Sequence, residues 1–149
     1  MKIQLTESRL VGLGEEPYII AELGSNHNGD MDLAKKLIES AKASGADCVK
    51  FQSWSAESLY SKTYYDDNPI AKRFVQKFSF SETELTKVSD YCREQGISFS
   101  STPYSRTEVD FLLEKCNVPY IKVASMDLNN HLFLDYITRT GAPIVLSTG

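Results

Sequence analysis

The sequence predicts a parallel α/β protein, and two further observations favour a (β/α)8 TIM-type barrel over an open doubly wound sheet. Short apolar strands alternate with amphipathic helices along most of the 149 residues, which demands a parallel sheet with right-handed crossovers. No Gly-x-Gly-x-x-Gly follows any expected strand, so the fingerprint of a dinucleotide-binding sheet is missing. Polar side chains also recur at alternate strand positions, which suits one shared barrel interior. They are Glu22, Lys50, Gln52, Ser100, Thr102 and Lys122.

The composition is that of an ordinary globular protein with one domain-sized core. Hydrophobic residues make up 42% and charged residues 24% of the chain, as in typical soluble domains. The net charge is −4 without a Lys/Arg cluster, which argues against nucleic acid or an anionic membrane as the main partner. No apolar run approaches the ~20 residues of a membrane span, and the N-terminus is not a signal peptide.

The cysteines indicate a reducing compartment. Cys48, Cys92 and Cys116 are an odd number without metal-type spacing, and free thiols are typical of cytoplasmic proteins. We therefore expect a cytoplasmic protein with reduced thiols and with Cys48 packed in a strand.

A short β-hairpin is expected to open the chain. Residues 3–5 and 9–11 are its strands, with a turn near Glu7 and Ser8. We expect residues 1–16 to form this lead-in and residues 17–149 to form the first half of a catalytic barrel.

Capping residues and glycines predict the barrel helices. Asp30 is an N-cap, and Gly45 follows the helix that it starts. Ser81 and Glu84 resemble a capping box, and Gly96 ends that helix. The expected helices cover residues 31–44, 82–95, 106–116 and 131–139. The expected barrel strands cover residues 18–24, 47–52, 97–101, 120–124 and 143–147.

The segment between the second barrel strand and the Ser81 helix is unusually long. Residues 53–79 exceed what a simple connection in a compact domain needs, and such segments often form lids or binding loops. Within it, residues 70–78 are expected to be helical.

The pattern supplies four βα units and a fifth strand, whereas a barrel needs eight. A half-barrel would expose a strand edge and an apolar face. We therefore expect residues 1–149 to be the N-terminal part of a longer protein.

Chemistry-bearing side chains gather at the carboxyl ends of the strands, where barrel enzymes hold their sites. Lys50 and Lys122 place ammonium groups at matched positions of the second and fourth strands. Together with hydroxyls and the backbone of residues 147–149 they would hold a phosphate or a phosphorylated carboxylate. The hydroxyls belong to Thr102, Ser125 and Ser147, and the carboxylates of Glu22 and Asp127 would serve proton transfer or sugar binding.

Simpler interpretations stand beside these. A strand-end lysine often points to solvent, and Glu22 would then only pair with one of the lysines. His27, between two asparagines, fits a surface, loop-bracing or catalytic role equally well. Neither His27 nor His131 has a second ligand at metal spacing, so we expect no metal site within these residues.

Five segments resemble the signature of the sialic acid synthase family, the N-acetylneuraminate synthases and their relatives. They occur in order between residues 17 and 149, and together they are far more specific than any one alone. The segments are IAELGSNHNG at residues 20–29, VKFQ at 49–52, SSTPYS at 100–105, IKVAS at 121–125 and IVLSTG at 144–149.

The resemblance implies a barrel enzyme that condenses phosphoenolpyruvate with an open-chain N-acyl hexosamine, typically N-acetylmannosamine, and releases phosphate. It also implies a divalent metal, Mn²⁺ or Mg²⁺, with histidine ligands beyond residue 149. A C-terminal antifreeze-like domain and a homodimer of the full-length protein belong to the same expectation. We expect residues 1–149 alone to be inactive, and turnover by that segment would contradict this.

The motif match also implies residue roles. Glu22 would act at the reacting centre and Asn68 would contact the sugar. Asp127 stands where many members carry Gly-x-Glu after the strand-end serine, which leaves the sugar open. The residues that would hold phosphoenolpyruvate are Lys50, Thr102, Lys122, Ser125 and Ser147.

Alternatives to an N-acetylneuraminate synthase remain at this point. Within the family, the product would be a legionaminic, pseudaminic or spore-coat sugar acid. Outside it, Lys122 would form a Schiff base in a metal-independent aldolase, or the chain would be a non-catalytic sugar-phosphate-binding fragment.

Overall fold

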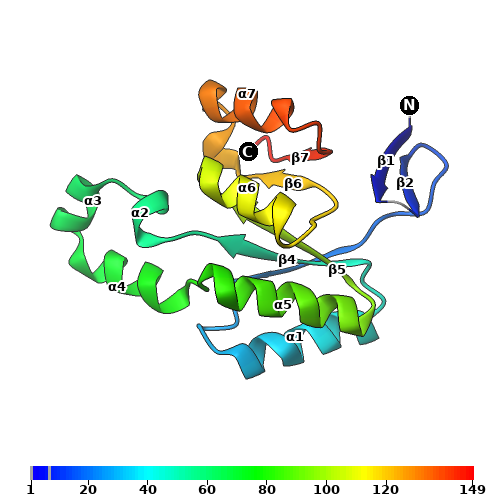
Figure 1. The fold of residues 1–149 in the computed structure, drawn as a ribbon, viewed down its shortest axis with the longest axis horizontal. Coiled ribbons are helices and arrows are strands. Elements are labelled where there is room, and N and C mark those ends of the chain that lie inside the picture. The colour runs from blue at the N-terminus through cyan, green and yellow to red at the C-terminus, as the bar shows by residue number, and fades with distance from the viewer. Residues whose placement is uncertain (1, 7) are drawn as a thin grey trace.

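The structure is a computed structural model that describes residues 2–6 and 8–149. In this part of the chain, parallel strands alternate with outer helices from Ile20 onward (Figure 1). The strands are β3 (Ile20–Gly24), β4 (Cys48–Ser53), β5 (Ser98–Pro103), β6 (Ile121–Val123) and β7 (Ile144–Leu146). The outer helices are α1 (Met31–Ala43), α5 (Glu82–Gln95), α6 (Arg106–Glu114) and α7 (His131–Arg139).

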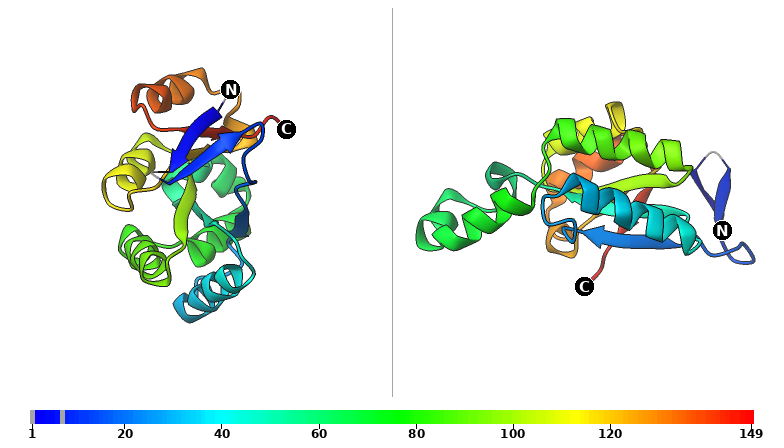
Figure 2. Two further views of the ribbon diagram at one scale, coloured as in Figure 1. Left: turned by 90° about the vertical axis from the view of Figure 1, so that its right-hand side faces the viewer. Right: turned by 90° about the horizontal axis from the view of Figure 1, so that it is seen from below.

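The strands follow one another in chain order across the sheet. Parallel ladders join β3 to β4, β4 to β5 and β6 to β7, and β5 lies beside β6. The four helices form an arc on one side of the strands (Figure 2). A doubly wound sheet would reverse its strand order and carry helices on both faces, so this arrangement is the first half of a (β/α)8 barrel, as predicted.

The barrel core lies between the strands and the arc of helices. Val49 and Phe51 of β4 and Val123 of β6 are completely buried, as are Ile38 of α1 and Val88 of α5. Among the described residues, no helix combines the length and apolar composition that a bilayer span requires.

An antiparallel hairpin precedes the barrel, as predicted. Its strands are β1 (Lys2–Thr6) and β2 (Arg9–Gly12), and the expected turn residue Glu7 lies outside the described residues. Asp47, just before β4, ties the hairpin down because its carboxylate accepts hydrogen bonds from Arg9 Nη1 at 2.6 Å and from the Ile19 backbone N–H at 2.7 Å.

The predicted caps are confirmed. Asp30 accepts hydrogen bonds from the first turn of α1, and Ser81 and Glu84 form a capping box at the start of α5. Gly96 ends α5 in the left-handed conformation that glycine adopts readily. The three cysteines are free and buried, with Cys48 completely inaccessible in β4.

The long segment after β4 forms three short helices, which we call the arm (residues 56–78). They are α2 (Ala56–Leu59), α3 (Lys62–Asp67) and α4 (Pro69–Phe78). The arm projects past the carboxyl end of β4 (Figures 1 and 2) and has a small core of its own, made of Ala56, Tyr65 and Val75. The helical prediction for residues 70–78 is confirmed, whereas α2 and α3 are too short to show an apolar period in the sequence.

Candidate functional site

Lys50 joins two other predicted site residues. It is 6% exposed on β4, and its Nζ donates a hydrogen bond of 3.2 Å to Thr102 Oγ1 on β5. The same Nζ forms an ion pair with Glu22 on β3. The parallel register produces this meeting because Glu22 lies opposite Lys50 in the β3–β4 ladder. The Glu22 side chain is 53% exposed, so the pair opens toward solvent on the Glu22 side.

Lys122 forms a matching arrangement on β6. Its Nζ donates to Ser147 Oγ at 2.5 Å and to the Val123 carbonyl oxygen at 2.7 Å. Burial lowers the pKa of Lys122, and the nearby charge of Lys50 lowers it further, against an opposing effect of Glu22. The two lysines therefore belong to one electrostatic cluster.

That cluster holds more positive than negative charge. Two ammonium groups share the single carboxylate of Glu22, and like charges held close together raise the cost of each other's ionised form. A bound anion would relieve this repulsion, and the hydroxyls of Thr102 and Ser147 orient the ammonium groups before it arrives. The geometry is therefore suited to a multiply charged anion.

Asp127 contributes a buried carboxylate just after β6, the strand that carries Lys122. It is 8% exposed and ends the short helical turn Ser125–Asp127 that follows β6. Oδ1 accepts a hydrogen bond of 3.1 Å from Asn130 Nδ2. Oδ2 is buried and has no partner among the described residues. A buried acceptor without a partner is costly, so Oδ2 is available for a ligand.

Like Asp127, two other predicted residues make no direct contact with the lysines. The Ser125 side chain is exposed and makes no hydrogen bond to another described residue. Asn68 lies in the arm between α3 and α4, where its Nδ2 donates to the Tyr64 carbonyl oxygen at 3.0 Å. The positions of both residues in a ligand complex stay predictions.

The fold and these strand-end groups agree with comparison to known proteins. The family model described as the NeuB family matches residues 37–149, which is well over half of the chain. The chain belongs to the NeuB family.

Named relatives of this NeuB-family chain include two sugar-acid synthases. It is 36% identical to the N-acetylneuraminate-9-phosphate synthase of Mus musculus over 100% of this chain and 44% of that protein. It is also 36% identical to the N,N'-diacetyllegionaminic acid synthase of Legionella pneumophila over 89% of this chain and 39% of that protein. The chain thus spans less than half the length of these relatives.

A solved structure shares the fold closely. The N-acetylneuraminic acid synthetase of Leptospira borgpetersenii, determined in complex with citrate, matches with a TM-score of 0.90 and 28% sequence identity. The match covers 100% of this chain and 50% of that chain.

Two residues near the cluster were given no site role by sequence reasoning. Gln52 lies on β4 close to Glu22, since a Cβ built on Gly24 would be 3.4 Å from Glu22 Oε1 and 3.7 Å from Gln52 Oε1. Burial raises the pKa of Tyr104 to about 12, with further contributions from Asp127 and Glu22. The sequence could have indicated Gln52 and Tyr104 by their position alone, because both lie at or just past strand ends within the family segments.

His27 braces the loop after β3, which was one of its three predicted roles. It is 1% exposed, and its ring stacks on Phe80 with 3.8 Å between centroids. Its Nδ1 accepts a hydrogen bond of 3.1 Å from the Gly29 backbone N–H. Burial lowers the pKa of His27, opposed in part by the charge of Glu84.

This buried imidazole predicts a pH dependence of stability. Because the folded-state pKa lies below the ordinary 6.5, the unfolded chain binds the proton more readily. The contribution of His27 is thus complete above about pH 6.5 and falls as the pH drops toward the folded-state pKa. Unfolding titrations between pH 8 and 5 should show this loss in the native protein and not in His27→Gln. The exposed His131 offers the control, since a pH dependence removed equally by His131→Gln would contradict the assignment.

The described residues do not fit a divalent metal. Among residues 2–6 and 8–149, no three His, Cys, Asp or Glu side chains come together. The strand-end cluster consists of ammonium and hydroxyl groups around one carboxylate, which is already paired. Such a donor set repels a cation, so we assign no step to a metal at these residues.

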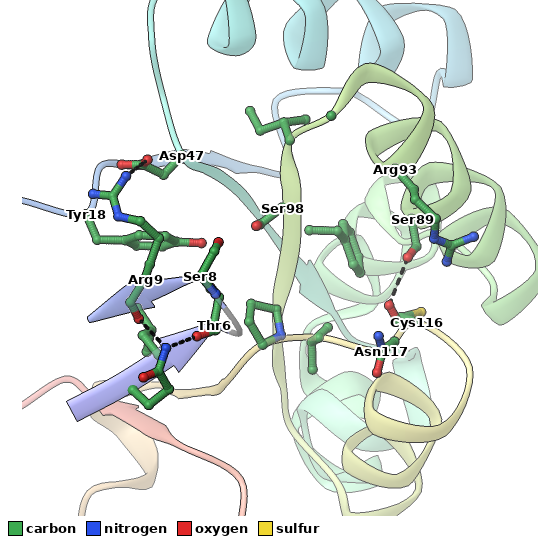
Figure 3. A pocket seen from close by; sticks show the side chains of 17 residues that line it. Thr6, Ser8, Arg9, Tyr18, Asp47, Ser89, Arg93, Ser98, Cys116 and Asn117 are labelled. Carbon is green, nitrogen blue, oxygen red and sulfur yellow. Dashed lines mark hydrogen bonds and ion pairs between the residues drawn. The ribbon is translucent and has the colours of Figure 1, made fainter. Parts of the chain in front are cut away.

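A cavity of about 700 Å³ lies at the other end of the strands (Figure 3). It is lined by the hairpin and by residues at or just before the starts of β3, β4, β5 and β6, including Arg9, Tyr18, Asp47 and Ser98. None of the predicted site residues lines it. The candidate site is therefore the strand-end cluster and not this cavity.

Proposed function

We propose that this NeuB-family protein condenses phosphoenolpyruvate with an open-chain N-acyl hexosamine, N-acetylmannosamine or a relative, to give a nonulosonic (sialic) acid and phosphate. The observation that carries the proposal is the Lys50–Lys122 cluster, in which two ammonium groups are held by hydroxyls beside a single carboxylate. The sugar-acid synthase names of the relatives support the product class.

The cluster suits phosphoenolpyruvate because this substrate carries a phosphate and a carboxylate on adjacent atoms. Lys50 and Lys122 would bind these anionic groups, while Thr102 and Ser147 keep the ammonium groups in place. Fixed charges of this kind stabilise developing negative charge without reorganisation during the reaction.

The proposed reaction balances with water as the third reactant. A bond forms between carbon 3 of phosphoenolpyruvate and the aldehyde carbon, water oxygen adds at carbon 2, and the carbon 2–oxygen bond to phosphate breaks. Glu22, half exposed and paired with Lys50, would carry a proton at the reacting centre. The proposal also includes a divalent metal, held by other residues, and a homodimer. Only the family resemblance supports these two parts.

Phosphate release by the native protein tests the proposal directly. The protein would be given phosphoenolpyruvate, Mn²⁺ and N-acetylmannosamine, with separate reactions that lack the sugar or contain a chelator. Release that requires the sugar would support the synthase, and the chelator reaction would test the metal. Absence of release with several N-acyl sugars, despite phosphoenolpyruvate binding, would contradict the synthase and favour a binding function.

A Schiff-base aldolase is the second candidate, favoured by the lowered pKa of Lys122. Desolvation and the neighbouring Lys50 lower this pKa, which is how lysine nucleophiles are activated. Borohydride trapping of a carbonyl substrate on Lys122 would support the aldolase. Absence of trapping, together with sugar-dependent phosphate release, would exclude it.

Asp127→Glu tests the sugar side of the proposed site. The added methylene moves the carboxylate in a buried position that already bonds Asn130, so we expect an altered preference among N-acyl sugars. A shift of about 1 kcal/mol, or fivefold, in relative kcat/KM is the scale of one neutral hydrogen bond. The KM for phosphoenolpyruvate should change less, and a larger change there would move Asp127 out of the sugar site.

A further inference from the structure

Tyr104 occupies a rigid position directly after β5. It follows Pro103, the last residue of that strand, and lies two residues beyond Thr102, the hydrogen-bond partner of Lys50. Its backbone N–H donates a hydrogen bond of 2.6 Å to Glu108 Oε2, in the first turn of α6. The Tyr104 backbone is therefore held between the end of the strand and the start of the helix.

The ring lies where the arm meets the barrel. It packs against Trp54, which follows β4 immediately, at 5.8 Å between ring centroids and an interplanar angle of 59°. Tyr60, at the end of α2, is close enough to raise the Tyr104 pKa electrostatically. The aromatic rings that follow β4 and β5 therefore form an apolar surface at this point.

Acidic groups from separate elements lie near enough to this ring to act on its pKa electrostatically. The charges of Asp127 after β6 and of Glu22 on β3 both act on Tyr104. The phenol is therefore protonated at neutral pH and is a donor. Its hydroxyl makes no hydrogen bond to another described residue, and Asp127 Oδ2 also has no partner.

The charged groups of the site suit an anion better than they suit a neutral sugar. The lysine side supplies cationic donors for an anion. The carboxylates of Glu22, which is paired with Lys50, and of Asp127 offer hydrogen-bond acceptors, whereas a neutral sugar presents both hydroxyl donors and oxygen acceptors. Such a ligand therefore also requires a neutral donor near these two carboxylates.

We propose that Tyr104 is an acceptor-binding residue, whose hydroxyl donates a hydrogen bond to an oxygen of the N-acyl sugar bound between Glu22 and Asp127. The Trp54 and Tyr104 rings form the apolar surface against which the sugar packs. This inference rests on the proposed synthase function and adds a residue to it.

Tyr104→Phe tests the inference because it removes only the hydroxyl and retains the ring contact with Trp54. Loss of one neutral hydrogen bond of about 0.5–1.5 kcal/mol corresponds to a 2- to 12-fold increase in KM for N-acetylmannosamine. The KM for phosphoenolpyruvate should stay within about twofold, on the same scale of effects. Tyr91→Phe is the matched control, since the Tyr91 hydroxyl bonds Glu39 on the outer helices, and it should change neither constant. Thermal unfolding of each variant verifies the fold.

The outcomes separate this inference from the proposed function. A selective increase in the sugar KM supports the role of Tyr104. Sugar-dependent phosphate release by the native protein, with Tyr104→Phe unchanged or altered only toward phosphoenolpyruvate, overturns that role and leaves the function standing. Failure of the native protein to release phosphate with any N-acyl sugar overturns the function and this inference together.

Discussion

Replacing Lys50 with alanine will weaken phosphoenolpyruvate binding by about 1.5–3 kcal/mol, or roughly 10- to 150-fold, the range for a hydrogen bond to a charged group. The side chain is almost fully buried, and its ammonium group is held in place by Thr102, so its loss removes a fixed positive charge from the site. Lys122→Ala should have an effect of the same size, because Lys122 completes the cationic cluster. Isothermal titration of each variant with phosphoenolpyruvate measures both effects.

The Lys50 variant needs two controls. Removing the ammonium group leaves the Glu22 carboxylate without its partner, which would itself repel an anion. The Lys50→Ala/Glu22→Gln double variant separates that repulsion from the lost attraction. Lys35→Ala, on the outer helix α1, should leave binding unchanged, since Lys35 lies over the Tyr91 ring away from the strand ends. Normal binding in both the Lys50 and the Lys122 variants would contradict the proposed anion site.

The strand-end cluster could be predicted from the sequence because parallel strands align their carboxyl ends. Once Glu22 and Lys50 were placed on neighbouring strands, the ladder put them opposite each other. The pairing of Lys122 with Ser147 follows in the same way from the β6–β7 ladder and the residue just beyond it. Asp30 and Ser81 could likewise be predicted as N-caps, because capping depends on hydrogen bonds between a side chain and the backbone a few residues away.

Features that depend on tertiary contacts could not be predicted. The helices α2 and α3 have four and six residues, so no apolar period forms, and they are stabilised by packing within the arm. His27 fitted three roles in the sequence, and only the position of Phe80, over fifty residues later, decides that it is buried. Tyr104 was visible in a family segment, but the groups around it come from four other elements.

Gly29→Ala will strongly destabilise the contact between the arm and the loop after β3. Gly29 has a φ of +75°, and a Cβ there would lie 2.3 Å from the backbone carbonyl oxygen of Lys77 in the last turn of α4. The left-handed backbone costs a non-glycine residue about 1–2 kcal/mol, and overpacking adds about 1–3 kcal/mol. We expect the free energy of unfolding to fall by about 2–5 kcal/mol, measured by denaturant titration.

Gly45→Ala isolates the part of this effect that comes from the contact. Gly45 has a φ of +83°, but a Cβ there would meet nothing within 4 Å, so only the backbone cost of about 1–2 kcal/mol applies. The excess loss in Gly29→Ala then measures how firmly α4 rests on the loop that His27 braces. Because the arm and not the lysine cluster is displaced, the variant should lose affinity for the sugar before affinity for phosphoenolpyruvate. Equal losses of stability in the two glycine variants would show that α4 does not press on this loop in solution.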